Sequence, residues 1–223
     1  MTGRGAQPAR DPALPGRLFG AELESLVPVL RECPDAGFGR PVAACPGWTV
    51  RDVLAHCSGD LTQVVNGDFG DDLGSPEANE RDIAARADWP HTRIVDELEH
   101  GLRHAGPAVA AAGGPLDKVA LGVWLHGGDV RDTLGVPGAY DGPGLPDALA
   151  LLSRLTHERG RPLVHACFDG AGAPFVLGAP APGVRPVRFH GDAPTLIRLC
   201  SGRATHATYE LSGGVAEALN MFG

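Results

Sequence analysis

The sequence has almost no lysine. All but one of its 19 basic residues are arginine, and the exception is Lys118. An enzyme that works through a Schiff base would have to use that lysine alone, so we set this chemistry aside. The 27 acidic residues give a formal net charge of −8, which argues against binding to nucleic acid or to an anionic membrane surface through charge. We therefore expect small-molecule or protein partners.

Long hydrophobic runs are also missing. No apolar stretch approaches the roughly 20 residues that a membrane span needs. The N-terminal segment MTGRGAQPARDPALPGR lacks the apolar core of a secretory signal peptide. These absences predict a cytoplasmic protein, free of the membrane, in which residues 1–14 form a flexible tail.

The cysteines are few and scattered. There are five of them, and no CxxC pair occurs. An odd number at wide spacing excludes a disulfide framework and a zinc ribbon as simple explanations. The sequence also has no GxSxG, GxGxxG or P-loop motif with which a hydrolase or a nucleotide-binding enzyme would begin.

What the sequence does contain is helical periodicity. Apolar residues recur at helical spacing in four segments, so we expect helices at residues 15–32, 49–66, 91–112 and 116–134. Thr49 and Asp52 resemble a capping box at the start of the second segment. The stretch NGDFGDDLGSPEANER, after that helix, is expected to be an irregular connection. Four amphipathic helices predict an antiparallel bundle over residues 15–137.

The pattern changes after GVPGAYDGPGLP, which we interpret as a linker. Residues 146–158 are expected to be helical, and PFVLGAP, VRPVRFHG and THATYEL to be extended. Asp192 is a candidate N-cap for a helix over DAPTLIRLCSGR, and VAEALNMF is expected to close the chain as a helix. Residues 145–223 are therefore expected to form a smaller α+β domain.

His56 lies off the apolar stripe of its helix. At 100° per residue it falls on a second face, together with Asp52, Gly59, Asp60 and Gln63. His126 and Asp129 share a face of the fourth helix in the same way. If both stripes face one core, His56 and His126 converge inside the bundle.

Two imidazoles and a carboxylate with an open position form the ligand set of a catalytic zinc site. We therefore take His56, His126 and Asp129 as candidate metal ligands. The same pattern also fits a structural histidine on each helix and an Asp129 that pairs with Arg131 or Arg51.

Gly127 and Gly128 lie in the interior of the fourth helix. Each costs about 1 kcal/mol relative to alanine there. Something therefore approaches the backbone at this point, either a neighbouring helix or a ligand.

Several segments together resemble one protein family. CPGWTVRDVLAH, NERDIAARADWPHTRIVDEL, WLHGGDVRDTLG and LIRLCSGR followed by LSGGVAEAL are similar to the mycothiol-dependent maleylpyruvate isomerases, a branch of the DinB-like metalloenzymes. The resemblance implies a mainly α protein with a DinB-like four-helix bundle and a smaller, sterol-carrier-like α+β domain. It also implies the thiol mycothiol as cofactor or cosubstrate and a divalent metal, usually zinc.

The resemblance assigns roles to particular residues. His56 and His126 fall on the two histidine ligands of the family, and Trp48 and Gly127 are candidate contacts of the cofactor. Arg203 matches an arginine that the family uses towards the carboxylate of its substrate, although a cation at a helix end also explains it. The family often has a glutamate four residues before the second histidine, where this chain has Gly122. Asp129 is then the substitute ligand and a candidate catalytic residue.

Two kinds of function are consistent with these residues. The first is a metal-dependent enzyme that isomerises or S-conjugates a small electrophile with mycothiol, as a monomer or a homodimer. The second is a metal-free DinB-like protein that acts as a binding module, or as a repurposed enzyme of secondary metabolism with His126 or Asp129 as acid and base.

Overall fold

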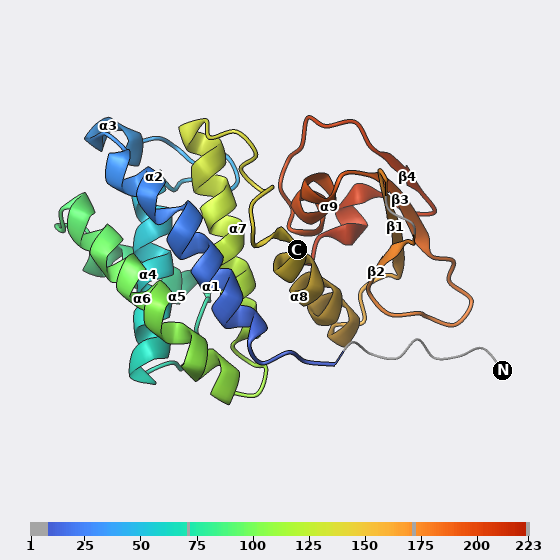
Figure 1. The fold of residues 1–223 in the computed structure, drawn as a ribbon, viewed down its shortest axis with the longest axis horizontal. Coiled ribbons are helices and arrows are strands. Elements are labelled where there is room, and N and C mark those ends of the chain that lie inside the picture. Colours follow the sequence, from blue (N-terminus) through green and yellow to red (C-terminus); the bar gives the residue numbers. More distant parts are fainter. Residues whose placement is uncertain (1–8, 71, 171–172, 222–223) are drawn as a thin grey trace. The chain divides into compact units, whose positions relative to one another are not determined.

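The structure is a computed structural model that describes residues 9–70, 72–170 and 173–221 (Figure 1). Most of the expected flexible tail, residues 1–8, lies outside this range. The chain divides into two compact units, Asp11–Gly144 and a second unit that begins at Leu145. No described helix is both long and apolar enough to cross a membrane.

The first unit is built from helices. In chain order they are α1 (Leu14–Ser25), α2 (Val27–Glu32), α3 (Asp35–Phe38), α4 (Val50–Asn66), α5 (Pro76–Ala85), α6 (His91–Ala111) and α7 (Asp117–Leu134). The four long helices form a closed bundle in which α1 packs against α6 and α7, and α4 packs against the same two helices. Their apolar stripes meet in the core, as the periodicity predicts.

Helix α4, which carries His56, begins and ends as the sequence indicates. The Thr49 side chain accepts a hydrogen bond from the Asp52 backbone, and the Asp52 carboxylate accepts one from the Thr49 backbone, which completes the expected capping box. The helix ends at Gly67, whose φ of +72° is the left-handed conformation that glycine adopts readily. Local sequence therefore fixes both ends of this helix.

Two expectations for the first unit were wrong in detail. The helix expected at residues 15–32 is broken at Leu26, because Pro28 has no backbone N–H to continue the ladder and instead starts α2. The connection after α4 is irregular only up to Ser75, apart from residue 71, which is not described. Ser75 then accepts a hydrogen bond from the Ala78 backbone at 3.1 Å, and Pro76 opens α5.

The segment after α7 is more than a linker. Ala139 and Tyr140 are both buried, and the Tyr140 ring packs against Trp124 of α7 with ring centroids 6.0 Å apart. Residues in the segment interpreted as a linker are thus part of the bundle core.

The second unit combines helices with a small sheet. Its elements are α8 (Leu145–Glu158), β1 (Val164–Phe168), β2 (Phe175–Leu177), β3 (Val187–Gly191), α9 (Ala193–Cys200), β4 (Glu210–Ser212) and the 3-10 helix η1 (Ala216–Leu219). The strand order is β2-β1-β3-β4; β1 and β3 are parallel, and the two outer pairs are antiparallel. The expected N-cap is confirmed, because Asp192 accepts from the Thr195 backbone at 2.6 Å.

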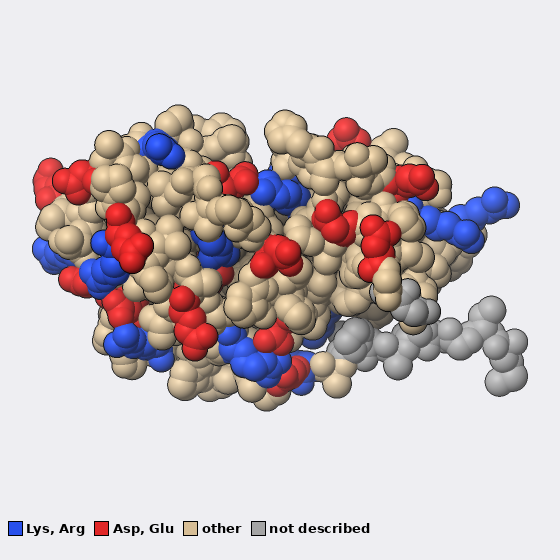
Figure 2. All heavy atoms as spheres, turned by 45° about the horizontal axis from the view of Figure 1, so that its top comes forward, with Lys and Arg blue, Asp and Glu red and all other residues tan. Residues whose placement is uncertain are grey.

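Some boundaries in this unit differ from expectation. Strand β1 was not anticipated, although its buried residues alternate in the register of a sheet with one covered face. The closing helix is only a short 3-10 turn, and Phe222 lies outside the described residues. On the face drawn in Figure 2, basic and acidic side chains are interspersed.

Candidate functional site

His56 and His126 meet inside the bundle. Their ring centroids are 5.4 Å apart and the ring planes are perpendicular. The His56 side chain is only 8% exposed and that of His126 is 19% exposed. The expectation that residues from two helices converge on one interior point agrees with this geometry.

The Nδ1 atom of His126 faces a carboxylate and a thiol. It lies 3.1 Å from Asp129 Oδ2 and 3.6 Å from Cys45 Sγ. The other oxygen of Asp129, Oδ1, accepts a hydrogen bond from the Tyr140 hydroxyl. Asp129 thus links the imidazole to the buried tyrosine of the segment that follows α7.

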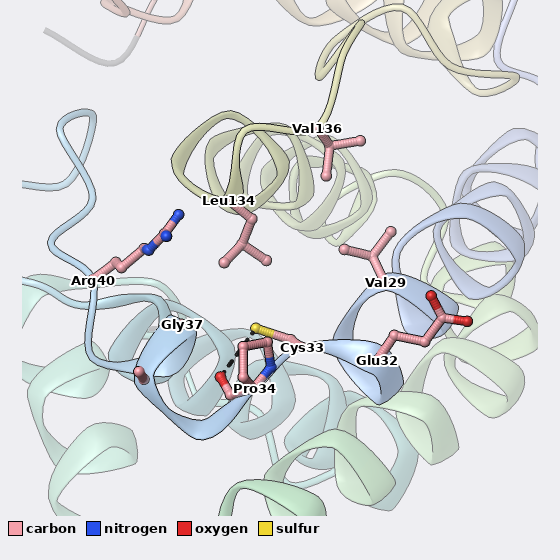
Figure 3. A pocket seen from close by; sticks show the side chains of 9 residues that line it. Val29, Glu32, Cys33, Pro34, Gly37, Arg40, Leu134 and Val136 are labelled. Carbon is pink, nitrogen blue, oxygen red and sulfur yellow. Dashed lines mark hydrogen bonds between the residues drawn. The ribbon is translucent and has the colours of Figure 1, made fainter.

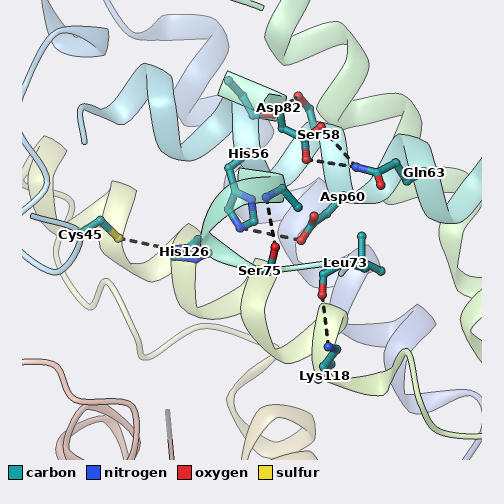
Figure 4. Close-up of polar contacts among 12 residues, drawn as sticks. Cys45, His56, Ser58, Asp60, Gln63, Leu73, Ser75, Asp82, Lys118 and His126 are labelled. Atoms are coloured by element: carbon teal, nitrogen blue, oxygen red, sulfur yellow. Dashed lines mark hydrogen bonds and ion pairs between the residues drawn. The ribbon is translucent and has the colours of Figure 1, made fainter. Parts of the chain in front are cut away.

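His56 faces two other carboxylates. Its Nε2 atom is 3.8 Å from Asp60 Oδ2, one helical turn away on α4 (Figure 4). His56, Asp60 and Asp82 each offer a ligand atom, and these atoms lie within 4.8 Å of one another. Asp82 lies on α5, and its carboxylate occupies the space that a side chain at Gly59 would fill.

The site holds unusual protonation states. Burial, together with the neighbouring His126, lowers the pKa of His56 to about 3, so its imidazole is neutral at physiological pH. Burial and then the charge of Asp82 raise the pKa of Asp60 to about 7, against the opposing effect of Lys118 and Arg86. A neutral imidazole is the form that binds a metal.

Trp48 lies next to both imidazoles. Its ring centroid is 5.4 Å from that of His56 and 6.4 Å from that of His126. Its indole Nε1 donates to Glu80 Oε1 at 3.1 Å, which ties it to α5. Of the two expected cofactor contacts, Trp48 is therefore adjacent to the paired histidines.

The glycines of α7 have different neighbours. A Cβ atom at Gly127 would overlap the Glu22 carboxylate, and one at Gly128 would lie 2.5 Å from the Tyr140 ring. Close packing thus accounts for both residues. At Gly122 a Cβ atom would meet no described atom within 4 Å, so this position has room for a side chain.

The arginines considered as partners of Asp129 are engaged elsewhere. Arg131 donates to both oxygens of Glu22, at 2.7 and 3.0 Å, and this pair is buried. Arg51 donates to backbone carbonyls at the end of α5 and beyond it. In the second unit, Arg203 Nη1 donates to the Ser201 carbonyl at 2.9 Å.

Two cavities open at the end of the bundle near Arg40. One has a volume of about 390 Å³ and is lined by apolar side chains together with Glu32, Cys33 and Arg40 (Figure 3). Burial raises the pKa of the Cys33 thiol, so this cysteine is not preactivated as a nucleophile. The second cavity, of about 310 Å³, shares Arg40 and reaches Asp129. Both are within the size range of small-molecule sites.

Sequence reasoning did not nominate Cys45, Asp60, Asp82 or Tyr140. For Asp60 a signal existed, because a carboxylate four residues after a histidine shares its helix face. Tyr140 lies in the segment interpreted as a linker, and Asp82 directly follows the stretch expected to be irregular, so no periodicity placed either residue at the site.

The chain matches the model of a known protein family. A model described as the mycothiol maleylpyruvate isomerase N-terminal domain matches residues 19–136, more than half of the chain. The chain belongs to this family. The match covers most of the bundle, including both histidines, and confirms the resemblance noted in the sequence.

Two solved structures resemble this family member. One is a mycothiol-dependent maleylpyruvate isomerase, with a TM-score of 0.56, and the other is a histidine-to-alanine mutant under the same name, with a TM-score of 0.55. Each is 18% identical and covers 92% of this chain and 95% of its own. The likeness confirms the expected fold class, mainly α with a smaller α+β part. No match was found among curated protein sequences.

Proposed function

We propose that this chain is a metal-dependent enzyme that uses mycothiol to isomerise or S-conjugate a small electrophilic substrate. The observation that carries this proposal is the pairing of His56 and His126, two imidazoles from different helices with centroids 5.4 Å apart. Family membership supports the choice of thiol and reaction.

The residues present fit a divalent cation, for which we propose zinc. Two imidazoles that bind one tetrahedral zinc through bonds of about 2.0–2.1 Å place their ring centres about 5 Å apart, close to the observed spacing. The Nδ1 atom of His56 is buried without a hydrogen-bond partner among the described residues, and buried polar atoms left unpaired are uncommon. When bound, such a cation supplies a thiol with a lowered pKa at neutral pH.

The proposed third ligand is a carboxylate. The sequence nominated Asp129, three residues after His126, and the same carboxylate hydrogen-bonds to His126 Nδ1. A hydrogen bond at Nδ1 fixes the tautomer and leaves Nε2 as the nitrogen for ligation.

The protein groups then position the reactants. Trp48 shields one side of the paired imidazoles, so we assign it to mycothiol binding and the exclusion of water. Gly127 is accounted for by Glu22, and we leave it out of the proposed mycothiol site. Arg203 is proposed to bind the carboxylate of the substrate.

The reaction class follows from thiolate chemistry. The sulfur of mycothiol forms a bond to an electron-poor double bond, whose π electrons move onto the conjugated carbonyl. Rotation about the resulting single bond and expulsion of the thiolate give the isomer. Protonation of the adduct without expulsion gives the S-conjugate.

One observation favours a second candidate function. Gly122 has no side chain at the position where the family resemblance implies a glutamate ligand, and the space beside it is open. The second candidate is a metal-free protein that acts as a binding module or as an enzyme with a different reaction. The experiment described next distinguishes it from the metal-dependent enzyme.

The test is metal content together with turnover. Protein purified without chelator should contain about one zinc per chain, as a single catalytic site requires, and should convert maleylpyruvate only when mycothiol is present. His56→Ala and His126→Ala should lose both the zinc and the activity. His100→Ala, at an exposed position of α6, is the matched control and should keep both. Protein without metal under all conditions would establish the second candidate instead.

A further inference from the structure

Asp60 has the features of a ligand without its cation. Its side chain is 9% exposed, and its Oδ1 atom is buried with no hydrogen-bond partner among the described residues. Its Oδ2 atom lies 3.8 Å from His56 Nε2 (Figure 4). A buried carboxylate with an unsatisfied oxygen is costly unless something of opposite charge binds it.

The position of Asp60 on its helix also suits ligation. His56 and Asp60 are one turn apart on α4, so their side chains share a face. The same i, i+4 spacing places two ligands of one zinc on a helix in known metalloproteases.

Asp129 is differently engaged. Its Oδ1 atom accepts from the Tyr140 hydroxyl, and its Oδ2 atom is 3.1 Å from His126 Nδ1. Both oxygens therefore have partners within the protein. A carboxylate bonded to the far nitrogen of a ligating histidine orients that ring and does not itself bind the metal.

Other donors near the two histidines are also less suited. Cys45 lies 3.6 Å from the same Nδ1 atom of His126 that faces Asp129. Asp82 accepts two hydrogen bonds from Gln63, at 3.2 and 3.1 Å, and lies 3.5 Å from Arg86. Both oxygens of Asp82 thus accept hydrogen bonds, whereas Oδ1 of Asp60 has no hydrogen-bond partner among the described residues.

We propose that Asp60 completes the cation site with His56 and His126, and that Asp129 and Tyr140 position His126 from behind. This inference rests on the proposed function, because it assigns a ligand of the same site. It replaces the role first given to Asp129, and explains how the chain binds a cation with glycine at position 122.

The first test measures zinc by elemental analysis in two isosteric variants. Asp60→Asn removes the ligand charge and should lower zinc affinity by more than 100-fold, to below stoichiometric content. Asp129→Asn should keep about one zinc per chain, with an affinity reduced about 10–100-fold, as is usual when an outer partner of a histidine is lost. Zinc retained in Asp60→Asn and lost in Asp129→Asn would overturn the inference.

A second variant gives a signal that does not depend on loss of binding. In Asp60→Cys loaded with cobalt, a thiolate at the ion should produce a sulfur-to-cobalt charge-transfer band in the near ultraviolet. Asp129→Cys and the unmodified protein should show cobalt bands without that feature. A sulfur band in Asp129→Cys alone would contradict the assignment.

Introducing a carboxylate at position 122 provides a rescue. Gly122 lies one turn before His126 on α7, in open space. The double variant Asp60→Asn with Gly122→Glu should regain stoichiometric zinc, which also shows that the single variant was folded. A double variant that binds no zinc while Asp60→Asn alone still binds it would overturn the inference.

These outcomes separate the two levels of the argument. An unmodified protein that binds no cation overturns both the inference and the proposed function. Zinc held through Asp60 without mycothiol-dependent turnover supports the inference and overturns the proposed function.

Discussion

Asp129 joins the imidazole of His126 to the hydroxyl of Tyr140 through its two carboxylate oxygens. The three residues come from one helix and from the segment just after it. This arrangement fixes the orientation of a histidine whose ring faces His56 across the bundle. The predictions below test this site and the packing that holds it in place.

Removing the tyrosine hydroxyl should weaken the proposed metal site without abolishing it. In Tyr140→Phe, the Oδ1 atom of Asp129 loses its tyrosine donor, so His126 is less firmly oriented. We expect zinc affinity to fall about 10–100-fold with the stoichiometry unchanged, as measured by competition with a chromophoric chelator. Tyr209→Phe, in the second unit, is the control and should leave the affinity unaltered. Equal affinities in the two variants would argue against an orienting role for Tyr140.

The glycines of α7 should respond in opposite directions to alanine. Gly122→Ala meets no described atom within 4 Å, so the gain in helix propensity should raise the free energy of unfolding by roughly 0.5–1 kcal/mol. Gly128→Ala places a methyl group 2.5 Å from the Tyr140 ring and should lower it by about 1–3 kcal/mol. Urea denaturation measures both. A stabilised Gly128→Ala protein would show that Tyr140 does not pack as described.

The Glu22–Arg131 pair should be important for stability. Burial raises the pKa of Glu22, and the two charged hydrogen bonds from Arg131 oppose that rise. Glu22→Gln leaves a buried guanidinium without its anion, so we expect a loss of about 3–5 kcal/mol in the free energy of unfolding. Asp72→Asn, which breaks the exposed pair with Arg81, is the control and should leave the urea midpoint unchanged. Similar midpoints for the two variants would refute the prediction.

Cysteine reactivity should follow burial. Burial raises the pKa of Cys200 to about 12 and that of Cys57 well above its ordinary value, whereas Cys167 is exposed. The Cys200 thiol therefore stays protonated at pH 8, and alkylation requires the thiolate. Brief treatment of the folded protein with iodoacetamide should therefore label Cys167 and spare the other two. Mass spectrometry identifies the labelled cysteines. Cys57 and Cys200 should become labelled only when the chain is unfolded, for example in urea, and their labelling in the folded protein would contradict the prediction.

Much of the fold was predictable because it depends on short-range pattern. Helix α4 illustrates this, since Thr49, Asp52 and the apolar stripe specify its start and its buried face. The errors arose where a local signal was overlooked or outweighed. Pro28 breaks the first helix, and Ser75 with Pro76 starts α5 in a stretch whose glycines and aspartates suggested only a loop.

The candidate site was predictable only in part. His56 and His126 could be nominated from their helix faces and from the resemblance to the family. Neither periodicity nor spacing indicated that Asp82 would lie near His56 or that the Tyr140 hydroxyl would bond to Asp129. These side chains arrive from other segments, and sequence distance carries no information about such approaches.

The sequence by itself determined the helices, the acidic and lysine-poor composition, and the pair of histidines that lie off the apolar stripes. The tertiary structure alone decided which carboxylate each histidine faces, because that choice depends on how α4, α5 and α7 pack against one another. The same packing gives Asp129 two partners and leaves one oxygen of Asp60 without any among the residues that the structure describes. A buried oxygen can form hydrogen bonds only with the groups next to it, and the packing of the helices determines which groups those are.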